Sequence, residues 1–219
     1  MNGEPNDAEH TQTDVGELIA HVRHDLRSPL TAIRGFASLM LSQQDRLSPA
    51  QQRQFVEAIC QASDQMVRLV DSLQVLLTNE AEGCLINPER VDIPALIEEA
   101  LKEWKGKDTS RTFSSVVARA LPPARCDPRY TRLAIDIIIG HAIGELPPGT
   151  GILVQPKARA SRIAITVRGE DRDQEKDEAS HPRKWDIGMS AFTRIVQAHG
   201  GRISEKAGAV TFTLPVWRA

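Results

Sequence analysis

His24 and Asp25 are neighbours in the stretch HVRHDLRSPLTAIRGF, which covers residues 21–36. An imidazole with an ordinary pKa of about 6.5 is mostly neutral at neutral pH, so one ring nitrogen is free to act as a nucleophile. A neighbouring carboxylate can orient the ring and accept the proton of the other nitrogen, which makes the free nitrogen more nucleophilic. The pair therefore predicts group-transfer chemistry at His24.

The helix that carries this pair is predicted from the spacing of its apolar residues. Between residues 15 and 40 these alternate steps of four and three, and Pro29 takes one of the apolar positions. This spacing is typical of a helix with a heptad-like apolar seam. His24 lies about 200° around the helix from its apolar neighbours Val22 and Leu26. We therefore expect the His24 ring to face solvent.

Pro29 is the unusual residue of this helix. A proline in a helix interior costs about 3 kcal/mol, because it lacks the backbone donor and its ring presses on the carbonyl one turn earlier, here that of Asp25. An exposed histidine beside an acid is, by itself, most often an ordinary surface pair. A costly proline so close to it indicates a functional reason, and we expect Pro29 to shape the turn that presents His24.

A second helix follows a break at residues 43–47. Ser48 is expected at its N-cap, Pro49 at its first position and Gln51 in a capping box. Its apolar seam runs from Phe55 to Leu76. Two such helices joined by a short loop predict an antiparallel hairpin.

A single hairpin would leave much of both apolar seams in water. Each buried aliphatic side chain contributes about 1.5–3 kcal/mol, which favours pairing of two hairpins into a four-helix bundle. We therefore expect a homodimer. The alternative is that the seam packs against the C-terminal half of the same chain.

The second half of the chain mixes helix and strand patterns, with a charged run at residues 170–184 that is expected to be a solvated loop. We predict the α+β class, with an N-terminal antiparallel two-helix hairpin followed by an α/β sandwich on a mixed sheet. The expected domains are a disordered N-terminus at 1–12, the hairpin at 13–82 and the sandwich at 88–219. Helices are expected at 91–104, 127–146 and 185–201, and strands at 111–117, 151–158, 161–169, 201–206 and 209–216.

Composition limits the possible classes of protein. The 219 residues are 41% hydrophobic but 4% aromatic, so the core should be mainly aliphatic. A formal net charge of −2 with interspersed charges argues against a nucleic-acid partner. No apolar run reaches the roughly 20 residues of a membrane span, so we expect a cytoplasmic protein. Cys60, Cys84 and Cys126 lack metal or disulfide spacing, and we expect them to pack as small apolar groups.

The stretch HDLRSPLTAIRGFASLM resembles the phosphoacceptor box of two-component sensor histidine kinases, whose pattern is His, Glu or Asp, Leu, Arg, Ser or Thr, Pro, Leu. The hairpin around it is similar to that family's dimerisation and phosphotransfer domain. The resemblance implies that His24 is phosphorylated, that Asp25 activates it and that Ser28 helps to position the phosphoryl group. It also implies that Arg27 contacts the phosphoryl group or the acidic site of a response-regulator receiver.

Residues 88–219 resemble, in the order of their elements, the ATP-binding domain of the same family. That family carries two asparagines on one helix, the second of which holds Mg²⁺. In this sequence the corresponding positions are Ile137 and His141. Magnesium prefers oxygen ligands, so an imidazole is a poor substitute.

Two further motifs of the family's nucleotide pocket are changed. The acid and two glycines of Asp-x-Gly-x-Gly, whose acid reads the adenine amino group, align with Gly169, Asp171 and Asp173. The glycine-rich box that cradles the phosphates aligns with KWDIGM, which retains a single glycine. Trp185 and Asp186 in that box would obstruct and repel a triphosphate. We therefore expect no cofactor, with ATP and Mg²⁺ bound only if this altered pocket is active.

The other histidines are interpreted as structural. His141 is expected to face the core or a dimer interface, and we expect no metal site there. His199 precedes two glycines at a helix end, where its charge would suit the helix dipole. His181 lies in the charged run and is expected to be inert.

These observations favour a two-component phosphotransferase that carries the phosphoryl group on His24, exchanges it with a receiver aspartate and has impaired ATP binding. One alternative is an active ATP-dependent autokinase controlled by a separate sensor protein, so autokinase activity is left open. Another is a non-enzymatic regulator that dimerises with a true kinase. No feature of the sequence identifies the receiver, the input signal, the direction of phosphoryl flow or the pathway.

Overall fold

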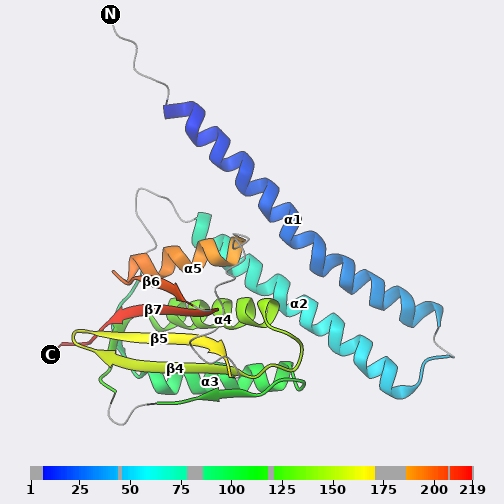
Figure 1. The fold of residues 1–219 in the computed structure, drawn as a ribbon. Helices are drawn as coiled ribbons and strands as arrows, with labels where there is room; N and C mark the ends of the chain where they lie inside the picture. The colour runs from blue at the N-terminus through cyan, green and yellow to red at the C-terminus, as the bar shows by residue number, and fades with distance from the viewer. Residues whose placement is uncertain are drawn as a thin grey trace, which may run out of the picture. The chain divides into compact units, whose positions relative to one another are not determined.

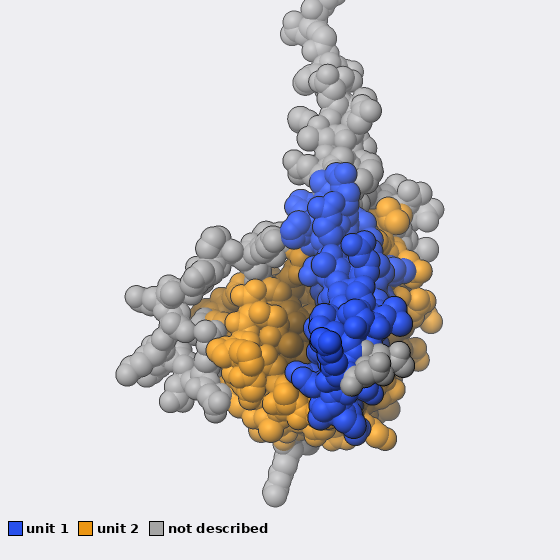
Figure 2. All heavy atoms as spheres, turned by 90° about the vertical axis from the view of Figure 1, so that its right-hand side faces the viewer, with its two compact units in different colours: residues 1–70 blue, residues 71–219 orange. Residues whose placement is uncertain are grey.

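The computed structural model describes residues 7–43, 46–77, 86–117, 121–170, 186–206 and 208–218, with side chains from residue 20 onward. The chain divides into two compact units, Met1–Val70 and Asp71–Ala219, which are coloured separately in Figure 2. The division falls inside a helix, and the expected domain limits at 82 and 88 stay a prediction.

Unit 1 contains the predicted helical hairpin, formed by α1 (Asp7–Ser42) and most of α2 (Pro49–Leu77), both labelled in Figure 1. The rings of Phe36 and Phe55 lie 5.4 Å apart between the two helices. Helix α1 starts at Asp7, whereas disorder was expected up to residue 12. The apolar seam marks where packing starts, but a helix can extend beyond it because each added residue completes a backbone hydrogen bond.

The predicted capping box starts α2. The backbone N–H of Ser48 donates to Oε1 of Gln51 at 3.0 Å, and the backbone N–H of Gln51 donates to Oγ of Ser48 at 3.3 Å. These bonds satisfy groups that have no partner within the helix, which explains why α2 begins where it does. The capping prediction is confirmed.

Unit 2 is an α/β sandwich, as predicted. Its five-stranded sheet has the order β2-β4-β5-β7-β6, in which β2 pairs parallel with β4 and the other pairs are antiparallel. Its three main helices pack on one face of this sheet. The helices are α3 (Ile93–Lys107), α4 (Pro128–Glu145) and α5 (Ile187–Ala198), and the strands are β2 (Phe113–Ser115), β4 (Ile152–Arg159), β5 (Arg162–Gly169), β6 (Ile203–Lys206) and β7 (Ala209–Pro215).

A small second sheet was not predicted. Strands β1 (Glu89–Val91) and β3 (Ala124–Cys126) pair antiparallel beside the main sheet. Each strand is three residues long, which is too short for a periodic sequence pattern to indicate it.

The core of unit 2 is mainly aliphatic, as the composition predicted, and it includes one edge-to-face pair between Phe192 and Phe212. The end of α2 belongs to this core. Val75 is buried in it, and the guanidinium of Arg194 on α5 donates to the carbonyl of Leu76 at 3.0 Å. The last turns of α2 are therefore part of unit 2 rather than a free connection.

The cysteines differ in environment. Cys126 is buried, and its burial raises the pKa of the thiol to about 11. Cys60, in contrast, is exposed on α2, so the expectation of apolar packing is wrong for this residue. Its neighbours Ile59 and Ala62 lie on the seam, and the helical period turns residue 60 away from it. Cys84 lies outside the described residues.

Within the ranges that the structure describes, no helix combines the length and the apolar character needed to cross a membrane.

Candidate functional site

The solvent-facing position predicted for His24 is confirmed. Its side chain is 64% exposed on α1, and its Nδ1 lies 3.2 Å from Oδ1 of Asp25, whose side chain is 18% exposed. An ionised carboxylate can only accept hydrogen bonds, so in this pair Nδ1 carries the proton. In the neutral ring, the other nitrogen, Nε2, then holds the lone pair.

The remaining predicted residues surround this pair on α1. Ser28 and Arg27 are both exposed, and the carbonyl of Arg27 accepts a hydrogen bond from Oγ1 of Thr31 at 2.8 Å. Pro29 is buried inside α1, which continues to Ser42. Exposed polar groups and a buried proline therefore occupy the same turn, while the roles predicted for the individual residues stay predictions.

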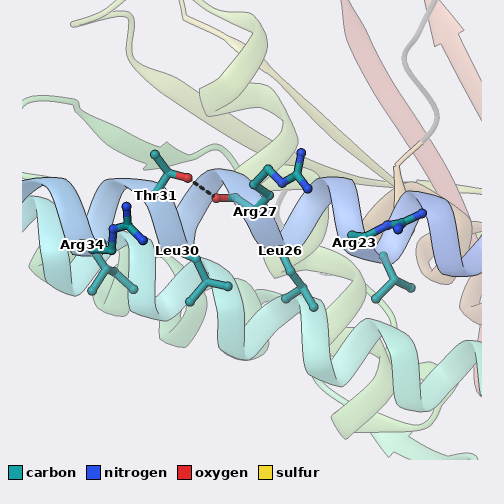
Figure 3. Close-up of a pocket in the computed structure, with 8 residues that line it drawn as sticks. Arg23, Leu26, Arg27, Leu30, Thr31 and Arg34 are labelled. Carbon is teal, nitrogen blue, oxygen red and sulfur yellow. Dashed lines mark hydrogen bonds between the residues drawn. The ribbon is translucent and has the colours of Figure 1, made fainter.

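A groove of about 1010 Å³ runs along this part of α1. In Figure 3, Leu26 and Leu30 project from one side of the helix, and the side chain of Arg27 points away from them. Among the lining residues, Arg27 was predicted as a site residue from the sequence. The lining residues are Val22, Arg23, Leu26, Arg27, Leu30, Thr31, Ile33 and Arg34.

In unit 2, the first of the two aligned asparagine positions is apolar and packed. Ile137 is 7% exposed, and its Cγ2 lies 3.4 Å from where a Cβ on Gly188 would be. Ile137 therefore faces the first turn of α5. His141, the second position, is half-buried on α4.

The N-terminus of α5 is capped by the protein itself. Oδ1 of Asp186 accepts a hydrogen bond from the backbone N–H of Met189 at 2.7 Å, and the carbonyl of Asp186 accepts from the N–H of Ser190. A helix N-terminus favours negative charge, and here a side-chain carboxylate supplies it.

The space beside Gly169 is filled by apolar groups. A Cβ at Gly169 would lie 3.3 Å from Cδ2 of Leu146 and 3.2 Å from Cγ2 of Thr150. Arg111 holds this wall in place, and its side chain is almost fully buried. The Arg111 guanidinium donates to four backbone carbonyls, those of Ile143, Leu146, Pro147 and Thr150. Sequence reasoning missed this cluster, because no local pattern indicates a side chain that bonds residues more than thirty positions away.

Glu170, the next residue, does not replace an acid at position 169. Its carboxylate accepts hydrogen bonds from Oγ1 of Thr112 at 2.7 Å and from Oγ of Ser114. These bonds hold the pKa of Glu170 below its usual value. Gly151 allows the carboxylate to pass, since a Cβ there would collide with it. Asp171, Asp173, His181 and Trp185 lie outside the described residues.

His199 differs from the sequence expectation. It is buried at the end of α5, where its Nε2 accepts a hydrogen bond from the backbone N–H of Asp127 at 2.9 Å and its Nδ1 donates to the carbonyl of Ile195 at 2.8 Å. Because Nε2 accepts a hydrogen bond, it carries no proton, and the ring is neutral in this arrangement. The prediction that a charged His199 interacts with the helix dipole is therefore wrong. The predicted structural role fits, because the ring connects α5 to the start of α4.

Among the described residues, no group of three or more His, Cys, Asp or Glu side chains could hold a metal ion.

Known proteins resemble both halves of this arrangement. Residues 14–82 match the His Kinase A (phospho-acceptor) domain family. The adaptive-response sensory kinase SasA of Synechococcus elongatus is 29% identical over 92% of the chain. Residues 14–82 therefore form a phospho-acceptor domain of the histidine kinase type, and the chain is similar to sensor histidine kinases over most of its length. The family predicted from the phosphoacceptor box is thereby confirmed.

Further sensor histidine kinases and solved structures are similar to this chain. The methanogenesis regulatory histidine kinase FilI of Methanothrix harundinacea is 24% identical over 95% of the chain and 25% of its own length. The histidine kinase ThkA, solved in complex with the response regulator protein TrrA, has a TM-score of 0.62 at 18% identity, over 96% of this chain and 64% of that one. The Acinetobacter baumannii histidine kinase AdeS has a TM-score of 0.57 at 17% identity, over 88% of this chain and 96% of that one. The predicted hairpin followed by a sandwich is therefore the fold of this family.

The chain spans 59% of the length of the Synechococcus elongatus relative and 57% of that of the relative in Synechococcus sp. strain CC9311, which is 27% identical over 92% of this chain.

Proposed function

We propose that this protein is a phosphotransfer module of two-component signalling, in which His24 exchanges a phosphoryl group with an aspartate of a response-regulator receiver. The observation that carries the proposal is the exposed His24 ring, hydrogen-bonded through Nδ1 to Asp25, inside the segment matched by the phospho-acceptor family. In the solved complex of ThkA, a related histidine kinase is bound to a response regulator protein, which supports a receiver as the partner class.

The chemistry follows from the ring geometry. The Nε2 lone pair of His24 attacks the phosphorus of the receiver's aspartyl phosphate and forms an N–P bond. The P–O bond to the receiver carboxylate breaks, and its electron pair stays on that carboxylate. The imidazole becomes positively charged in this step, and the negative charge of Asp25 stabilises it. The reverse step returns the phosphoryl group through the same bonds.

Two further residues are assigned to the phosphoryl oxygens. The guanidinium of Arg27 can donate to them in a charge-assisted hydrogen bond. Ser28 lies one helical turn beyond His24, where its hydroxyl can position the incoming group. Both side chains are exposed and so accessible to a partner.

We also propose that unit 2 does not bind ATP productively, and that ATP with Mg²⁺ does not fit the residues present. Ile137 offers no ligand atom, and His141 is a poor magnesium ligand. Leu146 fills the space beside Gly169, where the family's adenine-reading acid would extend. Asp186 already caps the α5 N-terminus and would repel phosphate. The phosphoryl group then comes from a receiver rather than from this chain's own nucleotide pocket.

The third part of the proposal is a homodimer. Leu30 on α1 and Val56, Val67 and Val70 on α2 are exposed apolar side chains of unit 1, and Val67 is 60% exposed. The groove of Figure 3 adds an apolar strip on α1. A second hairpin would remove these side chains from water and complete a four-helix bundle. Analytical ultracentrifugation should give a dimer, and Val67→Glu should shift it towards monomer; a monomeric wild-type protein would contradict this part.

Phosphoryl transfer is tested by labelling. Receiver domains phosphorylated with acetyl phosphate should label the protein on an acid-labile histidine, whereas γ-labelled ATP with Mg²⁺ should not. His24→Gln should abolish the label. His21→Gln is the matched control, because His21 is another exposed histidine on the same helix, and it should retain the label. Failure of every receiver in a broad panel to label His24 would refute the phosphotransfer proposal.

The same experiment distinguishes the two alternatives. Labelling of His24 by ATP would establish an autokinase, as the names of the sensory-kinase relatives suggest, and would overturn the interpretation of unit 2. A non-enzymatic regulator would keep its cellular function in His24→Gln but lose it when the apolar seam is disrupted, for example by Leu73→Asp.

A further inference from the structure

The five-stranded sheet of unit 2 has one face without helices among the described residues. Residues such as Val154, Ile165 and Phe212 point into the helix-packed core. Leu153 and Ala164 are also nearly buried but lie outside that core cluster, as expected for the opposite side of a strand. We call this side the open face. In Figure 1 the strands β4, β5 and β7 lie in front of α4, so the open face is turned towards the viewer.

Alternation along the strands assigns the residues of the open face. Its charged side chains at the strand positions are all positive, and the other positions carry Leu153, Pro215 and hydroxyl, amide or small groups. No Asp or Glu occupies an open-face position within the strands β2, β4, β5, β6 and β7. Glu170, just beyond β5, is the nearest acid by register, and the hydroxyls of β2 and its preceding residue already bind its carboxylate. The positive residues are Lys157, Arg159, Arg162, Arg168 and Lys206.

The charge of this face contrasts with that of the whole chain. The protein has a formal net charge of −2, so the cations of the sheet are not part of a general positive charge. On α3, at the other side of the sandwich, exposed acids and exposed lysines alternate: Glu98, Glu99 and Glu103 stand beside Lys102, Lys105 and Lys107. The strand positions of the open face therefore differ from α3, because they carry cations without the acids that balance the lysines of α3.

The tip of the β4–β5 hairpin adds a second, independent observation. Arg159 pairs with Arg162 across the strands, and like charges directly opposite each other are destabilising. The turn between them places Ala160 at φ 50°, a conformation that favours glycine or asparagine. The turn is held because the carbonyl of Ser161 accepts from the N–H of Val216 at 3.0 Å. The like-charge pair and the positive φ both lower stability at the same exposed tip. Their presence together indicates that function constrains the residues there.

We propose that the open face is a docking surface for an acidic protein surface. Opposite charges across such an interface accelerate encounter and fix the orientation of the partner. The open face has no aromatic side chain at its strand positions, which argues against single-stranded nucleic acid, since base stacking uses aromatic rings. It also lacks exposed large apolar side chains, which argues against insertion into a lipid surface. The residues of this surface belong to unit 2, whereas His24 belongs to unit 1.

The test uses fluorescently labelled poly-L-glutamate as an acidic polypeptide probe, with the full-length protein and anisotropy as the readout. The wild type should bind, and added salt should weaken binding because the attraction is electrostatic. Lys157→Glu with Arg159→Glu should weaken binding about tenfold. Lys102→Glu with Lys105→Glu is the matched control, because it makes the same change in net charge on the exposed side of α3 and should change binding less than about twofold.

Several results would overturn the docking proposal. These are no binding by the wild type, an equal loss in the α3 control, or equally tight binding to oligouridylate or phosphatidylserine vesicles. Circular dichroism checks the fold of each variant. If the double glutamate variant unfolds, Lys157→Gln with Arg159→Gln removes the same two charges without adding acids, and it too should weaken binding relative to the control.

Discussion

The capping of α5 by Asp186 gives a prediction whose size follows from the structure. Its carboxylate accepts the backbone N–H of Met189 at 2.7 Å, and this partly buried bond satisfies a donor that has no partner within the helix. Removal of an N-cap side chain costs about 0.5–2 kcal/mol. We therefore expect Asp186→Ala to lower the free energy of unfolding by about 1 kcal/mol, or Tm by about 2–4 °C for a domain of this size.

Asp186→Asn is the matched control. Asparagine caps about as well as aspartate but carries no charge, so this variant should keep most of the stability. Thermal denaturation followed by circular dichroism measures both variants. If Asp186→Ala is as stable as the wild type, or if Asp186→Asn is destabilised as much as Asp186→Ala, the carboxylate does not act as a hydrogen-bonded cap.

The same variants address nucleotide binding. Neither should bind ATP with Mg²⁺ in calorimetry, because the apolar groups at Ile137 and Leu146 remain in place. Recovery of ATP binding by Asp186→Asn would mean that charge repulsion alone closes the pocket, and it would refute the proposed contribution of the other two residues.

Three further predictions concern single residues. Asp25→Asn should slow labelling of His24 by phosphorylated receivers about 100-fold with an unchanged circular dichroism spectrum, since the uncharged amide no longer stabilises the cationic ring; an unchanged rate would remove Asp25 from the mechanism. Burial raises the pKa of Asp136 above its usual value, so its ionisation destabilises the fold above that pKa and the penalty is relieved as the pH falls through it. Relative to wild type, Asp136→Asn should therefore gain more stability in urea denaturation at about pH 7 than at about pH 4, and the opposite order would contradict the role of burial. Ala160→Gly should raise the free energy of unfolding by about 0.5–1 kcal/mol in urea denaturation by relieving the positive φ, whereas a loss of stability would mean that the turn is not strained.

The parts of the fold that could be predicted are those with local causes. The apolar seam, the capping box of Ser48 and Gln51, and the exposure of His24 all follow from residue types at helical spacing. The four carbonyl bonds of Arg111 could not be predicted in this way, because they depend on where distant segments meet. The neutral state of His199 depends on one backbone N–H contributed from the start of α4, and a single sequence does not contain that distance.

The altered nucleotide pocket falls between these cases. Replacement of the aligned asparagine by Ile137 could be seen directly in the sequence. That Leu146 fills the space beside Gly169 could not, because its position depends on the turn that Arg111 holds. The missing polar groups of the nucleotide pocket can thus be read from the sequence. The apolar side chain that fills the space beside Gly169 is seen in the structure alone.

The packing of the α2 tail limits how the protein can be divided for experiments. Val75 fills part of the unit 2 core, and Leu76 supplies a carbonyl to Arg194. A fragment that starts at residue 88 would keep the whole sheet, but it would leave a cavity where Val75 was and would lose the hydrogen bond from Arg194 to the Leu76 carbonyl. Both losses cost stability. A fragment that begins at Asp71, where unit 2 starts, keeps both contacts and suits the study of unit 2 in isolation.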